Sequence, residues 1–183
     1  VAKSIRSLTD HLCIADMIGA QGLIFHLGSG KEMPKAKAIA QTIRAMRTIL
    51  KNVLGETQLI MENSAGGGQK IGATIEDIST LLRGARSSRV KVCFDTAHAF
   101  ETGLIPKYTP ASVRSFFNIW EKEIGIEHCV VIHANDSRTL AHSHHDQHEN
   151  IGEGHIGRKG FEVLGKEKRL RDLPFILEVP GFD

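Results

Sequence analysis

Amphipathic stretches with apolar residues at helical spacing alternate with short, mostly apolar runs along the whole chain. The first stretch carries Ile5, Leu8 and Leu12 on one side, and Gly19 suits the residue that follows a helix end. Later stretches open with residues that favour helix starts, and in one of them a Thr74 cap is followed by Asp77. The pattern therefore predicts helices that begin near residues 34, 74, 109 and 157, the last of them over 157–168.

The apolar runs between these helices are typical of buried strands. They cover residues 22–27, 59–62, 90–95, 129–133 and 174–179. Near-continuous apolar strands that alternate with helices predict an α/β fold with a parallel sheet covered on its faces. No linker interrupts this order, so residues 1–183 are expected to form a single domain, in which residues 139–154 are the longest irregular and most polar stretch.

The composition is that of an ordinary globular protein, with 41% hydrophobic and 24% charged residues among 183. A net charge of +2 neither requires nor excludes a polyanionic partner, so nucleic-acid binding would have to depend on local patches. No apolar run approaches the ~20 residues of a membrane helix, and the first residues lack a signal-peptide pattern. Three cysteines, an odd number, favour reduced thiols in a cytoplasmic protein.

Histidines and carboxylates fall where the predicted strands end, and the 10 histidines are the unusual feature of the composition. One acidic residue at a strand end is usually a helix cap or a turn former, but here every strand ends with a side chain that can bind a metal. In a parallel sheet of βα units all strand C-termini lie at one rim, where (β/α)8 barrels place their active sites. Carboxylates gathered there without a cation would repel one another, so the pattern predicts a divalent metal site. The strand-end residues are His26, Glu62, Asp95, His133 and Glu178.

Two further groups extend the predicted site. His98 follows Asp95 by three residues and can face the same rim, while Asp146 and His148 alternate in the polar loop. These three side chains, His98, Asp146 and His148, could form a three-ligand site with an open position for water, as in catalytic zinc sites. The prominence of imidazole favours zinc over magnesium, with manganese or iron left open.

Six motifs, which span nearly the whole chain in order, resemble those of bacterial endonuclease IV, the zinc-dependent family of apurinic/apyrimidinic endonucleases. The resemblance implies a (β/α)8 TIM barrel of the xylose-isomerase-like kind, here a partial barrel of about five parallel strands. It also implies that the chain corresponds to a C-terminal portion without the first three strands. The motifs are HLGSG at His26, MENSAGGG at Glu62, CFDTAHAFETG at Asp95 and His98, VIHANDS at His133, DQHENIGEGHIG at Asp146 and His148, and ILEVPG at Glu178.

The resemblance further implies hydrolysis of the DNA phosphodiester 5′ to an abasic site in base excision repair, by a hydroxide that zinc activates. Double-stranded DNA with abasic sites would be the partner, bound in the cytoplasm at the nucleoid. Glu62 would bridge two metal ions and help to orient the hydroxide, and manganese would be a substitute for zinc. The implied ligands of three zinc ions are His26 and Glu62 for the first, Glu62, Asp95, His133 and Glu178 for the second, and His98, Asp146 and His148 for the third.

Basic residues after the strand ends or beside motif glycines are candidates for contacts with DNA phosphates, although each could equally be ordinary surface charge. A partial barrel would also leave two apolar edge strands unpaired, which predicts an oligomer or a longer protein that contains this chain. A stable monomer in sedimentation would contradict that prediction. The candidate DNA-binding residues are Lys70, Arg138, Arg158 and Lys159.

Two other interpretations stay open. A sugar isomerase or epimerase of the xylose-isomerase-like barrels uses a Glu/Asp/His/Glu quartet on one divalent metal, which four of the strand-end residues would satisfy. The additional trio of His98, Asp146 and His148 favours the nuclease, and three zinc ions rather than one manganese would distinguish the two. The second alternative is a truncated paralogue that binds metal or DNA without cleaving.

Overall fold

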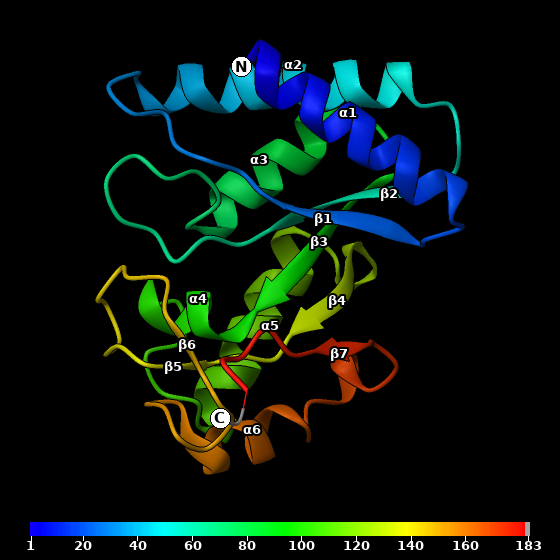
Figure 1. The fold of residues 1–183 in the computed structure, drawn as a ribbon. Coiled ribbons are helices and arrows are strands. Elements are labelled where there is room, and N and C mark those ends of the chain that lie inside the picture. Colours follow the sequence, from blue (N-terminus) through cyan, green and yellow to red (C-terminus); the bar gives the residue numbers. More distant parts are fainter. Residues whose placement is uncertain (182–183) are drawn as a thin grey trace.

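The computed structural model describes residues 1–181, and Figure 1 shows their arrangement. Five strands form one sheet in the order β1-β2-β3-β4-β7, and every neighbouring pair is parallel. The predicted α/β class with a parallel sheet is therefore confirmed. The strands are β1 (Gly22–His26), β2 (Gln58–Glu62), β3 (Val90–Asp95), β4 (Cys129–His133) and β7 (Phe175–Ile176).

Six α-helices precede or connect these strands in the described residues, with both α4 and α5 between β3 and β4, and the predicted Thr74 cap is present. The Thr74 hydroxyl accepts a hydrogen bond of 3.1 Å from the Asp77 N–H, which satisfies one of the free amides of the first turn. The last helix is shorter than predicted, since it ends before Gly165, a poor helix former, and residues 168–170 form a separate 3₁₀ turn. The helices are α1 (Ala2–Met17), α2 (Lys35–Asn52), α3 (Ile75–Ala85), α4 (Thr96–Glu101), α5 (Pro110–Glu123) and α6 (Gly157–Leu164).

The two faces of the sheet have different surroundings, because successive side chains on a strand point to opposite faces. On β2, Leu59 and Met61 join the helices in the main hydrophobic core, whereas Ile60 belongs to a small apolar cluster on the other face. The main core is centred on aromatic rings, and those of Phe94 and Phe117 meet edge to face at 5.3 Å. In the described residues the helices therefore cover one face, whereas the sequence predicts a sheet covered on its faces. The opposite face carries a small apolar cluster and the strand-end polar residues.

Strand pairing sets the level at which those polar side chains meet. His26 pairs with Glu62, and Asp95 pairs with His133. Between these two pairs the sheet is offset, since Glu62 pairs with Cys93 and Asp95 lies two residues further along β3. Residues two apart share a face, so Cys93 and Asp95 point to the same side as the other strand-end residues. The C-terminal rim of the sheet thus collects all of them.

Three elements differ from the predictions. α4 follows β3 directly, at a point where the sequence analysis predicts no helix. The stretch 139–154, predicted to be irregular, contains β6 (His148–Glu149), which pairs antiparallel with β5 (Asp136–Ser137). The last strand, predicted over 174–179, is limited to β7 because only β4 pairs with it at the edge of the described sheet.

The apolar residues beside this edge are partly exposed. Phe175, Ile176 and Leu177 have between 43% and 56% of their surface accessible. Such an edge offers unpaired main-chain groups next to apolar side chains, which is the usual route to strand association. The predicted association through edge strands stays a prediction, which sedimentation tests.

Two smaller points concern the cysteines and the helices. All three cysteines are free, and Cys93 and Cys129 are buried in the sheet. In residues 1–181 no helix combines the length and the apolar character that a membrane crossing requires.

Candidate metal centre

Glu62 lies at the centre of the strand-end residues, with three imidazoles around its carboxylate. Its Oε2 is 3.0 Å from Nε2 of His26, and its Oε1 is 2.9 Å from Nδ1 of His133 and 3.4 Å from Nδ1 of His98. The same His133 nitrogen is 2.9 Å from Oε2 of Glu178, which joins the end of the chain to the group. The Glu62 side chain is only 3% exposed, so these charges interact strongly in a medium of low polarity.

Asp95 is fixed by two asparagines, Asn63 of the MENSAGGG motif and Asn135 of the VIHANDS motif. Asn135 donates from Nδ2 to Oδ2 of Asp95 over 2.6 Å, and Asn63 makes two hydrogen bonds with the Asp95 main chain. The other carboxylate oxygen of Asp95 accepts from the His98 N–H over 2.7 Å and so caps α4. Asn63 directly follows β2 and Asn135 lies two residues after β4. Both asparagines therefore lie at strand ends, where a polar residue is expected to face the rim.

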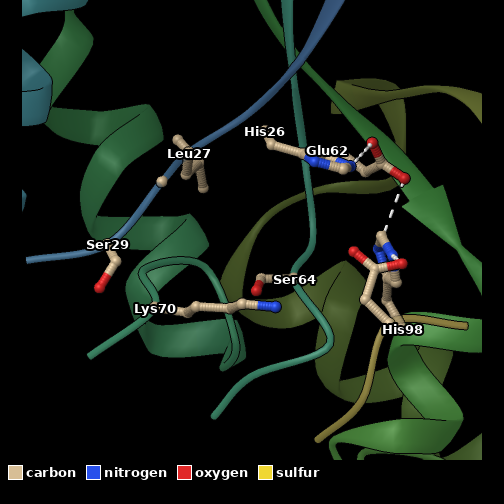
Figure 2. A pocket seen from close by; sticks show the side chains of 9 residues that line it. His26, Leu27, Ser29, Glu62, Ser64, Lys70 and His98 are labelled. Atoms are coloured by element: carbon tan, nitrogen blue, oxygen red, sulfur yellow. Dashed lines mark ion pairs between the residues drawn. The ribbon is translucent and has the colours of Figure 1, made fainter. Parts of the chain in front are cut away.

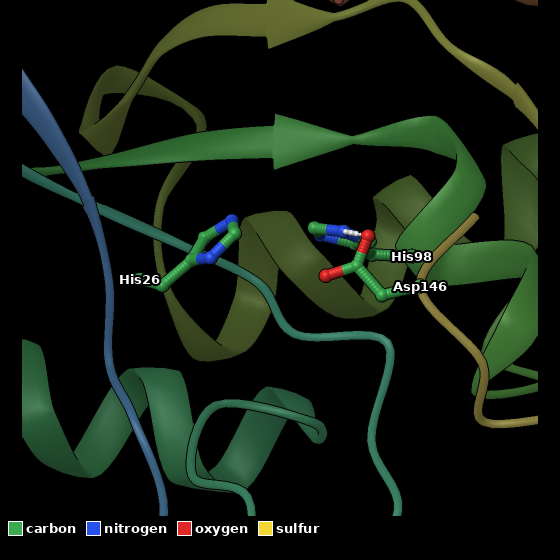
Figure 3. Close-up of side chains that lie close together, drawn as sticks. All are labelled: His26, His98 and Asp146. Atoms are coloured by element: carbon green, nitrogen blue, oxygen red, sulfur yellow. Dashed lines mark ion pairs between the residues drawn. The ribbon is translucent and has the colours of Figure 1, made fainter. Parts of the chain in front are cut away.

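α4, the segment before β6 and the first residue of β6 bring His98, Asp146 and His148 together. Nε2 of His98 lies 3.1 Å from Oδ1 of Asp146, and Nε2 of His148 lies 3.6 Å from the same oxygen. Both nitrogens are buried, yet within residues 1–181 neither has a hydrogen-bond partner of suitable geometry. Figure 3 shows His26 turned toward the same carboxylate from β1. Orphaned imidazole nitrogens that face one carboxylate suit a bound cation better than they suit an apolar core.

A glycine run lets two loops approach each other beside this trio. Gly66 and Gly67 have φ values of 81° and 87°, in the left-handed region that favours glycine. A Cβ at Gly66 would lie 2.7 Å from Nδ1 of His144, in the loop that also carries Asp146. A larger residue at Gly66 would therefore displace the His144 side chain and strain the backbone at this positive φ.

Four overlapping groups of side chains in the described residues could each hold a metal ion, their ligand atoms lying within 4.8 Å of one another. The predicted quartet is one of them. The predicted trio is not a single compact group, since its members divide between two groups that share His98. Cys93 is a member that the sequence analysis did not predict. Its position two residues before Asp95 on one strand indicates that both side chains point to the same face. The groups are Glu62, Asp95, His133 and Glu178; His26, His98 and Asp146; Asp95, His98 and His148; and Glu62, Cys93 and His133.

A pocket opens beside these groups, between the loops that follow β1 and β2 (Figure 2). Of the four basic residues considered for DNA contacts, Lys70 lines this pocket, and Figure 2 shows its side chain extending toward the metal-binding groups. Arg138 instead pairs with Glu149, with 3.0 Å between Nε and Oε2. Arg158 and Lys159 are exposed in the first turn of α6.

Burial and ion pairing act against each other on the pKa values of the site. Burial disfavours the charged Glu62 carboxylate, but hydrogen bonds from His133 and His26 outweigh it and lower the pKa of Glu62 to about 2. Burial also disfavours the charged imidazole of His98, but the surrounding negative charges, first that of Asp95, raise the pKa of His98 to about 10. Without a cation, the site therefore contains an ionised carboxylate and a protonated imidazole at neutral pH.

Cation binding to these residues is expected to release protons, because metal ligands must be deprotonated. With a pKa of about 10, His98 must lose a proton at pH 7 before it can bind a metal. We expect the release of about one proton or more per chain at pH 7, and an apparent cation affinity that rises with pH toward 10. Calorimetric titration with zinc in two buffers of different ionisation enthalpy measures the release, and equal heats in both buffers would contradict the prediction.

A model of the xylose isomerase-like TIM barrel family matches residues 1–183. The chain therefore belongs to the xylose isomerase-like TIM barrel family, and the barrel class expected from the sequence is confirmed.

Within this family, the resemblance to endonuclease IV is confirmed by more specific similarity. The chain is 34% identical over 183 residues to a probable endonuclease 4 of Sulfurihydrogenibium sp. (strain YO3AOP1), a match that covers 97% of this chain and 64% of the relative. The crystal structure of endonuclease IV from Thermus thermophilus has a TM-score of 0.79 at 31% identity, over 99% of this chain and 63% of that one. A D-tagatose 3-epimerase-like protein shares the fold, with a TM-score of 0.74 at 19% identity over 96% of this chain and 62% of that one. The chain thus spans just under two thirds of the length of its endonuclease relatives.

Proposed function

We propose that the protein is a metal-dependent endonuclease that hydrolyses the DNA phosphodiester 5′ to abasic sites in base excision repair. The observation that carries the proposal is the convergence of imidazoles and carboxylates from five strand ends, from α4 and from the β5–β6 segment at one rim, in a chain 34% identical to a probable endonuclease 4. Double-stranded DNA with abasic sites is the proposed partner. The cytoplasm, at the nucleoid, is the proposed place of action, which a fluorescent fusion would test.

Zinc is the proposed metal, because imidazoles are prominent among the donors, and manganese is the proposed substitute. The donor set suits such an ion, since His98 and His148 each present a buried nitrogen without a hydrogen-bond partner in the described residues. When bound, zinc would acidify a water to supply the nucleophile and would neutralise charge on the leaving oxygen. The proposed ligands of three ions are His26 and Glu62; Glu62, Asp95, His133 and Glu178; and His98, Asp146 and His148.

The protein's own residues would fix the geometry of the reaction. Glu62 is proposed to bridge two ligand sets and to orient the attacking water, and its low pKa keeps the carboxylate ionised for that purpose. Asn63 and Asn135 hold Asp95 in one orientation through its main chain and its carboxylate. Supporting hydrogen bonds of this kind keep metal ligands in place and tune their basicity.

An incision assay tests the proposal directly. The purified protein is incubated with a duplex oligonucleotide that has one abasic site, and with the same duplex without the lesion. We expect zinc-dependent incision of the abasic duplex alone, abolished by EDTA, with a 3′-hydroxyl that a polymerase can extend. Absence of EDTA-sensitive incision at stoichiometric protein would exclude the proposed activity and leave a paralogue that binds metal or DNA without cleaving.

The competing proposal is a sugar isomerase or epimerase that uses the quartet alone. The fold shared with a D-tagatose 3-epimerase-like protein is compatible with it, but a one-metal isomerase has no need of His98, Asp146 and His148. Metal analysis separates the two proposals: about three zinc ions per chain favour the nuclease, and one manganese ion per chain favours the isomerase.

Lys70 is the basic residue best placed to contact a DNA phosphate, because it lines the pocket beside the metal-binding groups. Replacing Lys70 with Ala is expected to weaken binding of abasic and intact duplexes alike and to reduce the salt dependence of binding by about one released counterion. Fluorescence anisotropy at several salt concentrations measures both effects. Lys166→Ala, at an exposed lysine beyond α6, is the control and should leave both unchanged. An unchanged salt slope for Lys70→Ala would contradict the assignment.

A further inference from the structure

Glu101, the last residue of α4, is a fully buried carboxylate that contacts the loop between β5 and β6. Its Oε1 accepts hydrogen bonds from the Ser137 hydroxyl (2.8 Å), the Gln147 N–H (3.3 Å) and the Thr139 hydroxyl (3.4 Å). Its main-chain oxygen accepts a further hydrogen bond of 3.1 Å from the His144 N–H. One residue thus holds the loop at its beginning, its middle and its end.

These contacts connect the two halves of the His98, Asp146 and His148 trio. Glu101 follows His98 by three residues, nearly one helical turn, on a helix whose first turn is capped by Asp95. Gln147, whose N–H donates to Glu101, lies between Asp146 and His148 in the chain. Glu101 therefore links the helix that carries His98 to the segment that carries Asp146.

Glu101 is not itself in position to bind a cation with this trio. It belongs to none of the candidate metal groups found in residues 1–181. Its second carboxylate oxygen, Oε2, is buried and has no hydrogen-bond partner among the described residues. A buried carboxyl group with an unpartnered oxygen is costly for folding, so packing alone does not account for a glutamate at this position.

We propose that Glu101 is a positioning residue, which holds the β5–β6 loop so that Asp146 and His148 face His98, and thereby sets the cation affinity of that trio. The inference rests on the proposed function only in requiring that cations bind at this rim. It concerns the proposed third-ion ligands His98, Asp146 and His148 and leaves the quartet of Glu62, Asp95, His133 and Glu178 unaffected.

The test compares Glu101→Ala with Glu101→Gln in the whole protein. Each variant, freed of metal, is titrated with zinc by calorimetry and with cobalt(II), whose visible absorption reports its ligand geometry. Glu101→Ala is expected to weaken one class of site by roughly 10–100-fold, the usual effect of losing a residue that supports a metal ligand, while the other sites keep their affinity. Glu101→Gln should stay close to the wild type, because its amide oxygen can accept the same hydrogen bonds.

Two further variants separate positioning from general destabilisation. Glu167→Ala removes a carboxylate that pairs with Arg169 at 2.8 Å, away from the metal groups, and should leave every site unchanged. Ser137→Ala removes the shortest hydrogen bond to the Glu101 carboxylate and should weaken the same class of site by a smaller factor. Circular dichroism verifies folding. If Glu101→Ala does not fold, Ser137→Ala is compared with the wild type, and an unchanged cation affinity of Ser137→Ala would then contradict positioning by Glu101.

The outcomes distinguish this inference from the proposed function. If the wild type binds several cations and folded Glu101→Ala binds them equally well, positioning by Glu101 is wrong and the proposed function stands. A loss in Glu101→Gln as large as that in Glu101→Ala would likewise overturn the hydrogen-bonding role. If the wild type binds no cation at all, both the inference and the proposed metal-dependent activity are wrong.

Discussion

Replacing Glu62 with Gln is expected to lower the single-turnover rate of abasic-site incision by more than about 100-fold, since residues that merely support metal ligands already contribute roughly 10–100-fold. The Glu62 carboxylate lies within 3.4 Å of nitrogens of His26, His98 and His133, so it is the shared element of the whole group. A neutral amide keeps the volume of the side chain but removes the negative charge that would hold two cations close together.

The control for this substitution is Glu121→Gln, at an exposed glutamate that pairs with Arg169 over 3.3 Å and lies outside the metal groups. Its incision rate should equal that of the wild type. Metal content and circular dichroism of Glu62→Gln are measured in parallel, because the expected defect is loss of metal in a folded protein. A Glu62→Gln protein that incises nearly as fast as the wild type would contradict the bridging role.

Removal of metal is expected to lower the melting temperature by about 8–16 °C. A ligand present at 1,000 times its dissociation constant stabilises a folded protein by about 4 kcal/mol, and in a chain of this size each kcal/mol shifts the melting temperature by roughly 2–4 °C. The physical reason is local: without a cation, the nearby imidazoles must compensate the charges of the buried carboxylates of Glu62 and Asp95, to which neutral N–H donors add only hydrogen bonds.

Differential scanning calorimetry with zinc and with EDTA measures this shift. The Glu62→Gln protein is the matched control. Because it is expected to bind less metal, EDTA should lower its melting temperature by less than it lowers that of the wild type. Equal melting temperatures of the wild type in zinc and in EDTA would show that the rim is stable as an ion-paired cluster and needs no cation.

The strands, and the rim at which they end, were predictable because both depend on local patterns. A buried parallel strand is a nearly continuous apolar run, and a polar residue that closes each run marks its C-terminal end, as Glu62 and Asp95 do. The parallel order then brings the ends together without further information. The last strand was overestimated because the length of an edge strand depends on its single neighbour, which its own residues do not specify.

The contacts around the rim could not be predicted, because they depend on register and on loop conformation. Cys93 lies beside Glu62 only because β3 is offset by two residues from the level of the other strand ends. Glu101 has no sequence signal of its own, since its partners lie 36 to 46 residues away in a loop without helical or strand periodicity. The pairing of β5 with β6 is equally non-local, as it joins two short segments across that loop.

The division of the predicted trio is the most informative difference. The sequence analysis grouped His98, Asp146 and His148 by residue type and placed them at one rim. In the structure, Asp146 lies close to each of the two histidines. The distances, however, assign His98 to two groups at once, one with His26 and one with Asp95. His98 thus lies at the junction between the loop and the strand-end residues.

The most direct test of several cations at one rim is a crystal of the protein grown with zinc and measured at the zinc absorption edge. The anomalous difference map is expected to contain separate peaks at Glu62, Asp95, His133 and Glu178 and at His98, Asp146 and His148, with a further one between His26 and Glu62. No peak at these residues, or one peak at the quartet alone, would contradict the multinuclear metal centre.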